Sequence, residues 1–141
     1  MVQQLESMEN VMAVELGFAP LLSPDIILLA LEMSQGEMPL IASLPAEQIL
    51  DLGGRCLEAG AAALSISPPR GSLWRDGRLV TGRLYGPCLL PRALDVVHSA
   101  AQLGLPIIGA GGVCTQADID SMLAAGAIAV QIDAALWLPG A

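Results

Sequence analysis

The sequence has few basic side chains and few aromatic rings, and each shortage argues against a class of function. Only six of its 141 residues are basic, against 14 acidic ones, so the formal net charge is −8. So few cations cannot form a basic patch, which argues against binding to nucleic acid or to an anionic membrane. Aromatic residues make up 3% of the chain, so a stacking platform for bases is not expected either.

Long apolar runs are also missing, although the chain as a whole is hydrophobic. Hydrophobic residues make up 54% of the sequence, and the mean hydropathy is +0.63. The longest apolar stretch, near Ile26, is bounded by Asp25 and Glu32, whereas a membrane span needs about 20 apolar residues. We therefore assign the excess hydrophobicity to strands buried on both faces, as in a parallel sheet covered by helices.

Cysteine is scarce as well. Cys56, Cys88 and Cys114 lack metal-like spacing, and their odd number argues against a disulfide framework. We expect three reduced, buried thiols and no metal site. The first ten residues, MVQQLESMEN, have neither the basic nor the apolar region of a secretory signal, so the expected location is cytoplasmic.

Short apolar runs alternate with segments of helical spacing along the chain. The expected strands are Val11–Leu16, Leu40–Leu44, Ala62–Ser67, Leu105–Gly109 and Ile128–Ile132. The expected helices span about 23–34, 46–58, 89–103 and 115–125, the first capped by Ser23 and the last by a Thr115–Asp118 pair. This alternation predicts a parallel sheet with right-handed crossovers in one α/β domain, residues 1–141. An open doubly wound sheet and part of an eight-stranded barrel both fit.

A long connection at about residues 68–88 interrupts the alternation. Within it, Asp76-Gly77 predicts a tight hairpin. Trp74 and Tyr85 are expected to anchor the connection by hydrophobic contact, with covering a ligand as the alternative. Its four arginines suggest either a solvated loop or an anion clamp; they are Arg70, Arg75, Arg78 and Arg83.

The sequence PIIGAGGV, residues 106–113, ends one expected strand in a glycine-rich turn. In either architecture the loop after a parallel strand lies on the ligand-binding face. Glycines there expose backbone N–H groups, and the next helix favours an anion at its N-terminus. We predict a phosphate ligand, with a tight turn that binds nothing as the alternative. The last strand ends near the same face, and barrels commonly bind phosphate between their last two loops, which favours the barrel.

From Gly82 to Ala135 the chain resembles the C-terminal part of the dihydroorotate dehydrogenases, which are FMN-dependent (β/α)8 barrels. GRLYGPCLLPRAL, PIIGAGGV and AGAIAVQIDAAL stand where that family has a GGLSGPAL-like turn, PIIGxGGI and AGAxAVQVGTA. Upstream, MAVELGFAP, MPLIASLP and EAGAAALSISPP resemble the fourth, fifth and sixth strands. The resemblance implies a partial (β/α)8 TIM barrel of about five βα units, strands 4–8. It also implies FMN as cofactor and the oxidation of dihydroorotate to orotate in pyrimidine biosynthesis.

The resemblance also implies a set of cofactor-binding positions. They are Gly86, Gly109, Ala110, Gly111 and Gly112, together with Asp133 and Ala134, which stand at the family's strand-eight Gly-Thr.

Several positions depart from the family pattern. Ser43 stands in place of a lysine that contacts the flavin ring, and Pro68-Pro69 in place of an Asn-Thr pair. The family's catalytic loop is reduced to Gly17–Leu22, GFAPLL, so no catalytic base is identified. His98, the single histidine, is expected on a helix surface. A non-catalytic scaffold or subunit-interaction domain and an α/β domain for another phosphorylated metabolite therefore remain alternatives.

Five strands do not close a barrel, because a complete one of this type needs about 250 residues. The open sheet would leave two unpaired edges. We therefore expect a homo-oligomer, or another chain that completes the barrel. The expected small-molecule partner carries a phosphate.

Overall fold

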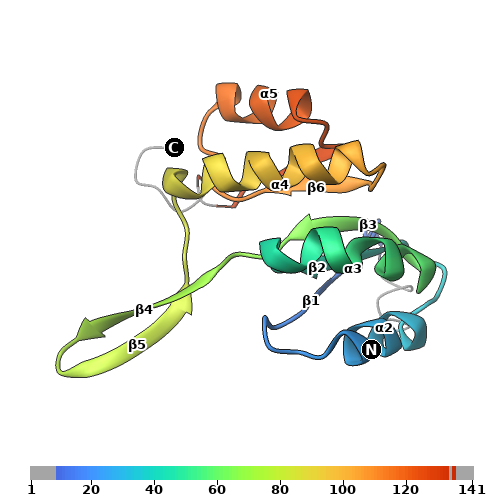
Figure 1. Ribbon diagram of the computed structural model, residues 1–141, viewed down its shortest axis with the longest axis horizontal. Helices are drawn as coiled ribbons and strands as arrows, with labels where there is room; N and C mark the ends of the chain where they lie inside the picture. Colours follow the sequence, from blue (N-terminus) through green and yellow to red (C-terminus); the bar gives the residue numbers. More distant parts are fainter. Residues whose placement is uncertain (1–8, 134, 136–141) are drawn as a thin grey trace.

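The computed structural model describes residues 9–133 and residue 135, and five strands in it form one parallel sheet (Figure 1). Along the sheet these are β1 Val14–Gly17, β2 Leu40–Leu44, β3 Ala61–Ile66, β6 Ile107–Ala110 and β7 Ala129–Gln131. All four pairings are parallel. Each new strand joins the same side of the sheet, without the reversal of order that defines a doubly wound sheet. The strand order is therefore that of a barrel segment.

Four helices connect the strands and supply half of the core. They are α2 Pro24–Met33, α3 Ala46–Glu58, α4 Leu90–Gln102 and α5 Gln116–Ala124, with a 3₁₀ helix η1 at Pro87–Leu89. Their buried side chains include Ile27, Leu31, Ile49, Val97 and Met122, which pack with strand residues such as Leu44, Leu64 and Ile107. None of the helices described is long and apolar enough to cross a membrane.

The expected element bounds agree with the structure apart from a few strand ends. The first strand begins at Val14 instead of Val11, and the last is confined to Ala129–Gln131. The strand expected from Leu105 begins only at Ile107, because Pro106 has no N–H to donate to the sheet. Ser23 takes the N-cap position of α2, but its side chain makes no capping hydrogen bond.

The connection at 68–88 is more ordered than expected, since most of it forms an antiparallel hairpin. Its strands are β4 Arg70–Arg75 and β5 Arg78–Arg83. Asp76 and Gly77 both have positive φ, 51° and 74°, as a two-residue hairpin turn requires. Figure 1 shows the hairpin extending away from the five-stranded sheet. The expected anchoring role of Trp74 is therefore wrong, and its side chain is 74% exposed.

The three cysteines differ in burial, whereas the sequence predicted that all three are buried. Cys56 on α3 is buried, and its burial raises the pKa of the thiol, although the charge of Arg55 partly opposes this. Cys114 is half-buried and Cys88 is exposed. The expectation of three buried thiols is thus wrong for Cys88, which lies in η1 ahead of the packed part of α4.

Candidate functional site

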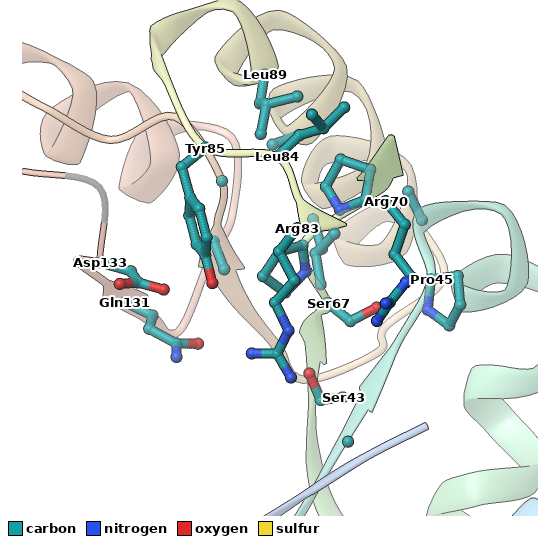
Figure 2. A pocket seen from close by; sticks show the side chains of 18 of the residues that line it. Ser43, Pro45, Ser67, Arg70, Arg83, Leu84, Tyr85, Leu89, Gln131 and Asp133 are labelled. Atoms are coloured by element: carbon teal, nitrogen blue, oxygen red, sulfur yellow. The ribbon is translucent and has the colours of Figure 1, made fainter. Parts of the chain in front are cut away.

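A cavity of about 680 Å³ lies at the carboxyl ends of the parallel strands. Residues that end or follow β1, β2, β3, β6 and β7 line it, and the base of the hairpin closes one side (Figure 2). In βα barrels this end of the strands carries the active site. A volume of this size suits a small-molecule ligand.

The glycine-rich turn after β6 reaches this cavity. Gly111 and Gly112 line it and have φ angles of 107° and 77°. A Cβ atom on Gly112 would lie 2.5 Å from the backbone nitrogen of Leu90 and 3.0 Å from the carbonyl oxygen of Gly86. Only glycine fits there, because both neighbours are backbone atoms. Gly86 therefore supports the turn from behind and does not line the cavity.

The amides of this turn divide into two groups. Those of Cys114 and Thr115 donate to Oδ2 of Asp118, at 3.0 and 2.8 Å. Those of Gly111, Gly112 and Val113 have no acceptor among residues 9–133 and 135. Gly112 and Val113 are buried, and buried amides are nearly always hydrogen-bonded. These three amides are thus available to an acceptor from a ligand.

The N-terminus of α5 does not offer the anion site that the sequence predicted. Thr115 and Asp118 form the expected capping box, so a carboxylate of the chain itself already occupies that end of the helix. The bond from the Cys114 amide, followed by those from Thr115, holds the pKa of Asp118 below its usual value. An anion in the cavity would meet the glycine turn, not the capped end of α5.

The other predicted cofactor positions have mixed placements. Ala110 lines the cavity, whereas Gly109 lies in β6, where a Cβ would lie 2.9 Å from Sδ of Met122. Gly109 therefore serves the close packing of α5 on β6. Asp133 lines the wall beyond β7, beside Gln131 in Figure 2. Ala134 lies outside the described residues.

The cavity also contains a carboxylate that the sequence prediction missed. Glu15 on β1 accepts hydrogen bonds from Oγ of Ser65 at 2.6 Å and from Nε2 of Gln131 at 3.5 Å. The sequence does contain a signal for Glu15, because it is a charged residue between Val14 and Leu16 in a short parallel strand. A charged residue there points away from the helix-covered side.

Cations also line the cavity. Arg70 and Arg83 come from the hairpin base, and Arg92 on α4 forms an ion pair with Glu47 on α3. Arg92 and Glu47 were also missed, because a surface-like pair on two helices carries no sequence motif. Ser43, at the end of β2, is 5% exposed and lies below Arg83 in Figure 2.

No catalytic base emerges from the positions examined in the sequence. The loop after β1 contributes Gly17, Phe18, Ala19 and Pro20 to the lining, none of which has an ionisable side chain. His98 is exposed on α4 and is not part of the lining, as expected for a surface residue. Among residues 9–133 and 135, no group of three or more His, Cys, Asp or Glu residues could hold a metal ion.

Sequence comparisons relate the chain to known families of enzymes. Residues 81–139 match the family of nitronate monooxygenases. The catalytic subunit of dihydroorotate dehydrogenase B (NAD(+)) from Petrotoga mobilis is 37% identical over 112 residues, which cover 72% of this chain and 37% of that protein. Dihydroorotate dehydrogenase A (fumarate) from Limosilactobacillus reuteri is 49% identical over 57 residues, 40% of this chain and 18% of that protein. The matched part of the chain thus spans between about a fifth and little more than a third of these curated relatives.

Solved structures show the same fold. The dihydroorotate dehydrogenase of Eimeria tenella has a TM-score of 0.57 and 22% identity, covering 70% of this chain and 29% of that one. The GMP reductase of Trypanosoma brucei has a TM-score of 0.58 and 22% identity, covering 93% and 27%. The expected fold class, a partial TIM barrel, is confirmed, and so is the resemblance to the dihydroorotate dehydrogenases.

Proposed function

From this kinship with the dihydroorotate dehydrogenases, we propose that the chain provides strands four to eight of an FMN-barrel oxidoreductase and holds the FMN phosphate. The observation that carries the proposal is that Gly111, Gly112 and Val113 line the cavity and that their amides have no acceptor among the described residues. Consecutive N–H groups in a glycine turn form an anion-binding concavity. The proposal treats residues 1–141 as one partial-barrel domain.

The residues present fit the phosphate end of FMN. Gly112 is pressed against the backbone of Gly86 and Leu90, so the turn is held rigidly before a ligand arrives. The next strand, β7, ends beside the turn, because Ala110 is paired with Gln131. Asp133 follows that strand and lines the same cavity, so its carboxylate must point away from a bound phosphate or meet a cation.

The fit is poorer at the flavin ring. Ser43 supplies a hydroxyl where the family resemblance implies a lysine, and Pro68-Pro69 replace side-chain amides. FMN, when bound, supplies the hydride-accepting chemistry for oxidation of dihydroorotate to orotate. The proposal therefore assigns to this chain the binding and orienting of FMN alone, because Phe18, Ala19 and Pro20, which stand in the family's catalytic loop, offer no base to the cavity.

Equilibrium dialysis against FMN tests the proposal, with bound flavin measured by its absorbance. We expect binding by the unmodified chain and at least about tenfold weaker binding by Gly112→Ala. Gly111→Ala is the second variant, because its Cβ would lie 3.5 Å from Ala93 and only the φ of 107° would be strained. Gly82→Ala is the matched control, since nothing lies within 4 Å of its Cβ. A lack of bound flavin at about 0.1 mM FMN would reject the proposal.

A second candidate is a different phosphorylated metabolite at the same turn. The GMP reductase structure that covers 93% of this chain is a complex with guanosine 5'-monophosphate. Ser43 and Pro68-Pro69 weaken contacts specific to the flavin ring but not those that the turn makes with a phosphate. This candidate predicts that GMP raises the melting temperature while FMN does not. The reverse result favours FMN.

A further inference from the structure

Two arginines face each other at the base of the hairpin. Arg70, the first residue of β4, is paired with Arg83, the last residue of β5, and both line the cavity. Directly opposed residues in an antiparallel pair have Cβ atoms about 5 Å apart, and like charges in such a pair are destabilising. The fold thus brings two positive charges together beside a cavity, and a bound anion would relieve their repulsion.

Neither arginine has a carboxylate partner in the described part of the chain. Three of the six basic residues have one: Arg55 pairs with Asp25, Arg75 with Asp76, and Arg92 with Glu47. Arg78 has none either, but it lies at the exposed turn of the hairpin and outside the cavity. Arg70 and Arg83 are therefore the two cations that both line the cavity and lack an ion pair among residues 9–133 and 135.

The backbone that carries the two arginines is firmly held. The amide of Leu84 donates to the carbonyl oxygen of Pro69 at 2.8 Å, which continues the ladder past the arginines toward the sheet. On the other side, the hydroxyls of Ser72 and Thr81 are hydrogen-bonded at 2.8 Å. Pro68 and Pro69 restrict the chain that leads out of β3. The backbone of both arginines is thus held in place, so only their side chains need to be ordered when they bind an anion.

Both guanidinium groups are directed to the same side of the hairpin. Figure 2 shows the group of Arg83 above Ser43 and that of Arg70 near Pro45. A guanidinium group offers five donors in a planar fork that matches carboxylate and phosphate oxygens. We propose that Arg70 and Arg83 form an oxyanion clamp, which holds a carboxylate or phosphate group of the small molecule bound in the cavity.

No acidic residue of the cavity forms an ion pair with Arg70 or Arg83 among the described residues. Glu47 is paired with Arg92, and Glu15 accepts hydrogen bonds from Ser65 and Gln131. Figure 2 shows Asp133 beside Gln131, away from Arg70. An anionic group is thus favoured at the hairpin base. The Gly111–Val113 turn follows β6 and the clamp lies on the hairpin, so the two can be tested separately.

Nitrogen-15 NMR of the full chain gives a direct test, since each arginine has its own Nε–H signal. The signals are assigned by their loss in Arg→Gln variants. Malonate and inorganic phosphate are the probes, titrated at constant ionic strength. We expect the signals of Arg70 and Arg83 to shift with a saturable dependence on at least one probe. Arg70→Gln should weaken the response of Arg83 about tenfold, and Arg83→Gln that of Arg70.

Arg75 and Arg78 are the matched control pair, because they face each other on the same ladder but lie outside the cavity. Saturation by malonate alone supports a carboxylate ligand, and saturation by phosphate alone a phosphate ligand. Equal shifts at Arg75 and Arg78, or no saturable shift at Arg70 and Arg83, would overturn the clamp.

The same titrations separate the clamp from the proposed FMN site. The backbone amides of Gly111 to Val113 report on the glycine turn, and the arginine Nε–H signals report on the clamp. In Gly111→Ala the turn should lose its response while the clamp keeps its own. Loss of both responses in this variant, with the fold intact by circular dichroism, would contradict a separate clamp.

Discussion

The hydroxyl of Ser65 on β3 donates a 2.6 Å hydrogen bond to the carboxylate of Glu15 on β1. The other oxygen of Glu15 accepts from Gln131 on β7, at 3.5 Å. In the sheet order β1-β2-β3-β6-β7, Glu15 and Gln131 belong to the two outermost strands. Their side chains meet only because the sheet is strongly curved, so this network joins the edges across the concave face, as a barrel interior does.

We predict that Glu15 and Ser65 are energetically coupled. Ser65 is 1% exposed, so Glu15→Ala leaves a buried hydroxyl without its partner, while Ser65→Ala removes a bond to a charged acceptor. Each change should lower the free energy of unfolding by about 1 to 2 kcal/mol. Urea denaturation of both variants and the double variant measures the coupling.

Glu58→Ala is the control, because this exposed residue of α3 has no ion pair among the described residues. It should change stability by less than about 0.5 kcal/mol. Strict additivity of the Glu15 and Ser65 changes would show that the hydrogen bond contributes nothing to folding.

Local patterns in the sequence predicted most of the fold. The bounds of β2 and α3 follow from Pro45 between them and from Gly60, whose φ of 101° ends the helix. The pairing of Arg70 with Arg83 could also have been predicted from the sequence, since a two-residue turn at Asp76-Gly77 fixes every pair of the hairpin. That step required treating the connection as a regular hairpin and not as a loop.

Other features depend on contacts that a single sequence does not encode locally. Glu15 and Gln131 are 116 positions apart, and only the curvature of the sheet brings them together. Trp74 is apolar enough to suggest burial, but the hairpin projects from the sheet and leaves it exposed. The division of the turn amides between Asp118 and the cavity likewise depends on three-dimensional geometry.

Two adjacent glycines of α3 should respond oppositely to alanine. Gly54 is exposed and has nothing within 4 Å of a Cβ, so Gly54→Ala should stabilise the protein by about 0.5 to 1 kcal/mol through higher helix propensity. A Cβ on Gly53 would lie 2.6 Å from Cδ1 of Leu64, which is fully buried. Gly53→Ala should destabilise the protein by about 1 kcal/mol or more, because the core is overpacked.

Thermal unfolding of the two variants, with the parent chain alongside, measures the difference. Each variant is the control for the other, because both replace a glycine of α3 by alanine. Stabilisation by both changes would mean that α3 packs less closely on β3 than the structure shows.

The capping box of α5 should make stability depend on pH in the acid range. The native pKa of Asp118 lies below its ordinary value of 3.8, because the ionised form accepts the backbone amides of Cys114 and Thr115. A depressed pKa contributes stability that is present above the unfolded value and is lost as the pH falls through the native value. Asp118→Asn should therefore lower the melting temperature at pH 7, and the deficit should shrink below about pH 4.

Melting curves at pH 3, 5 and 7 measure this deficit. Asp120→Asn is the control, since Asp120 lies in the same helix and, among the described residues, its carboxylate accepts only from the side chain of Gln116. An Asp118→Asn deficit that stays constant from pH 7 to pH 3 would contradict a role for the ionised carboxylate.

The free edges of the sheet predict self-association or binding to another chain. β1 and β7 each have one neighbouring strand within the described residues. Apolar side chains flank both edges: Met12 is 85% exposed and Ile128 is 60% exposed. An unpaired edge beside apolar side chains is a template for another strand, and lysine at such an edge discourages pairing.

Light scattering over a dilution series should therefore show a species larger than 14.5 kDa. Ile128→Lys and Met12→Lys should shift it toward the monomer, while Leu103→Lys, at an exposed position after α4, should not. A stable monomer at micromolar concentration would show instead that the five strands suffice alone.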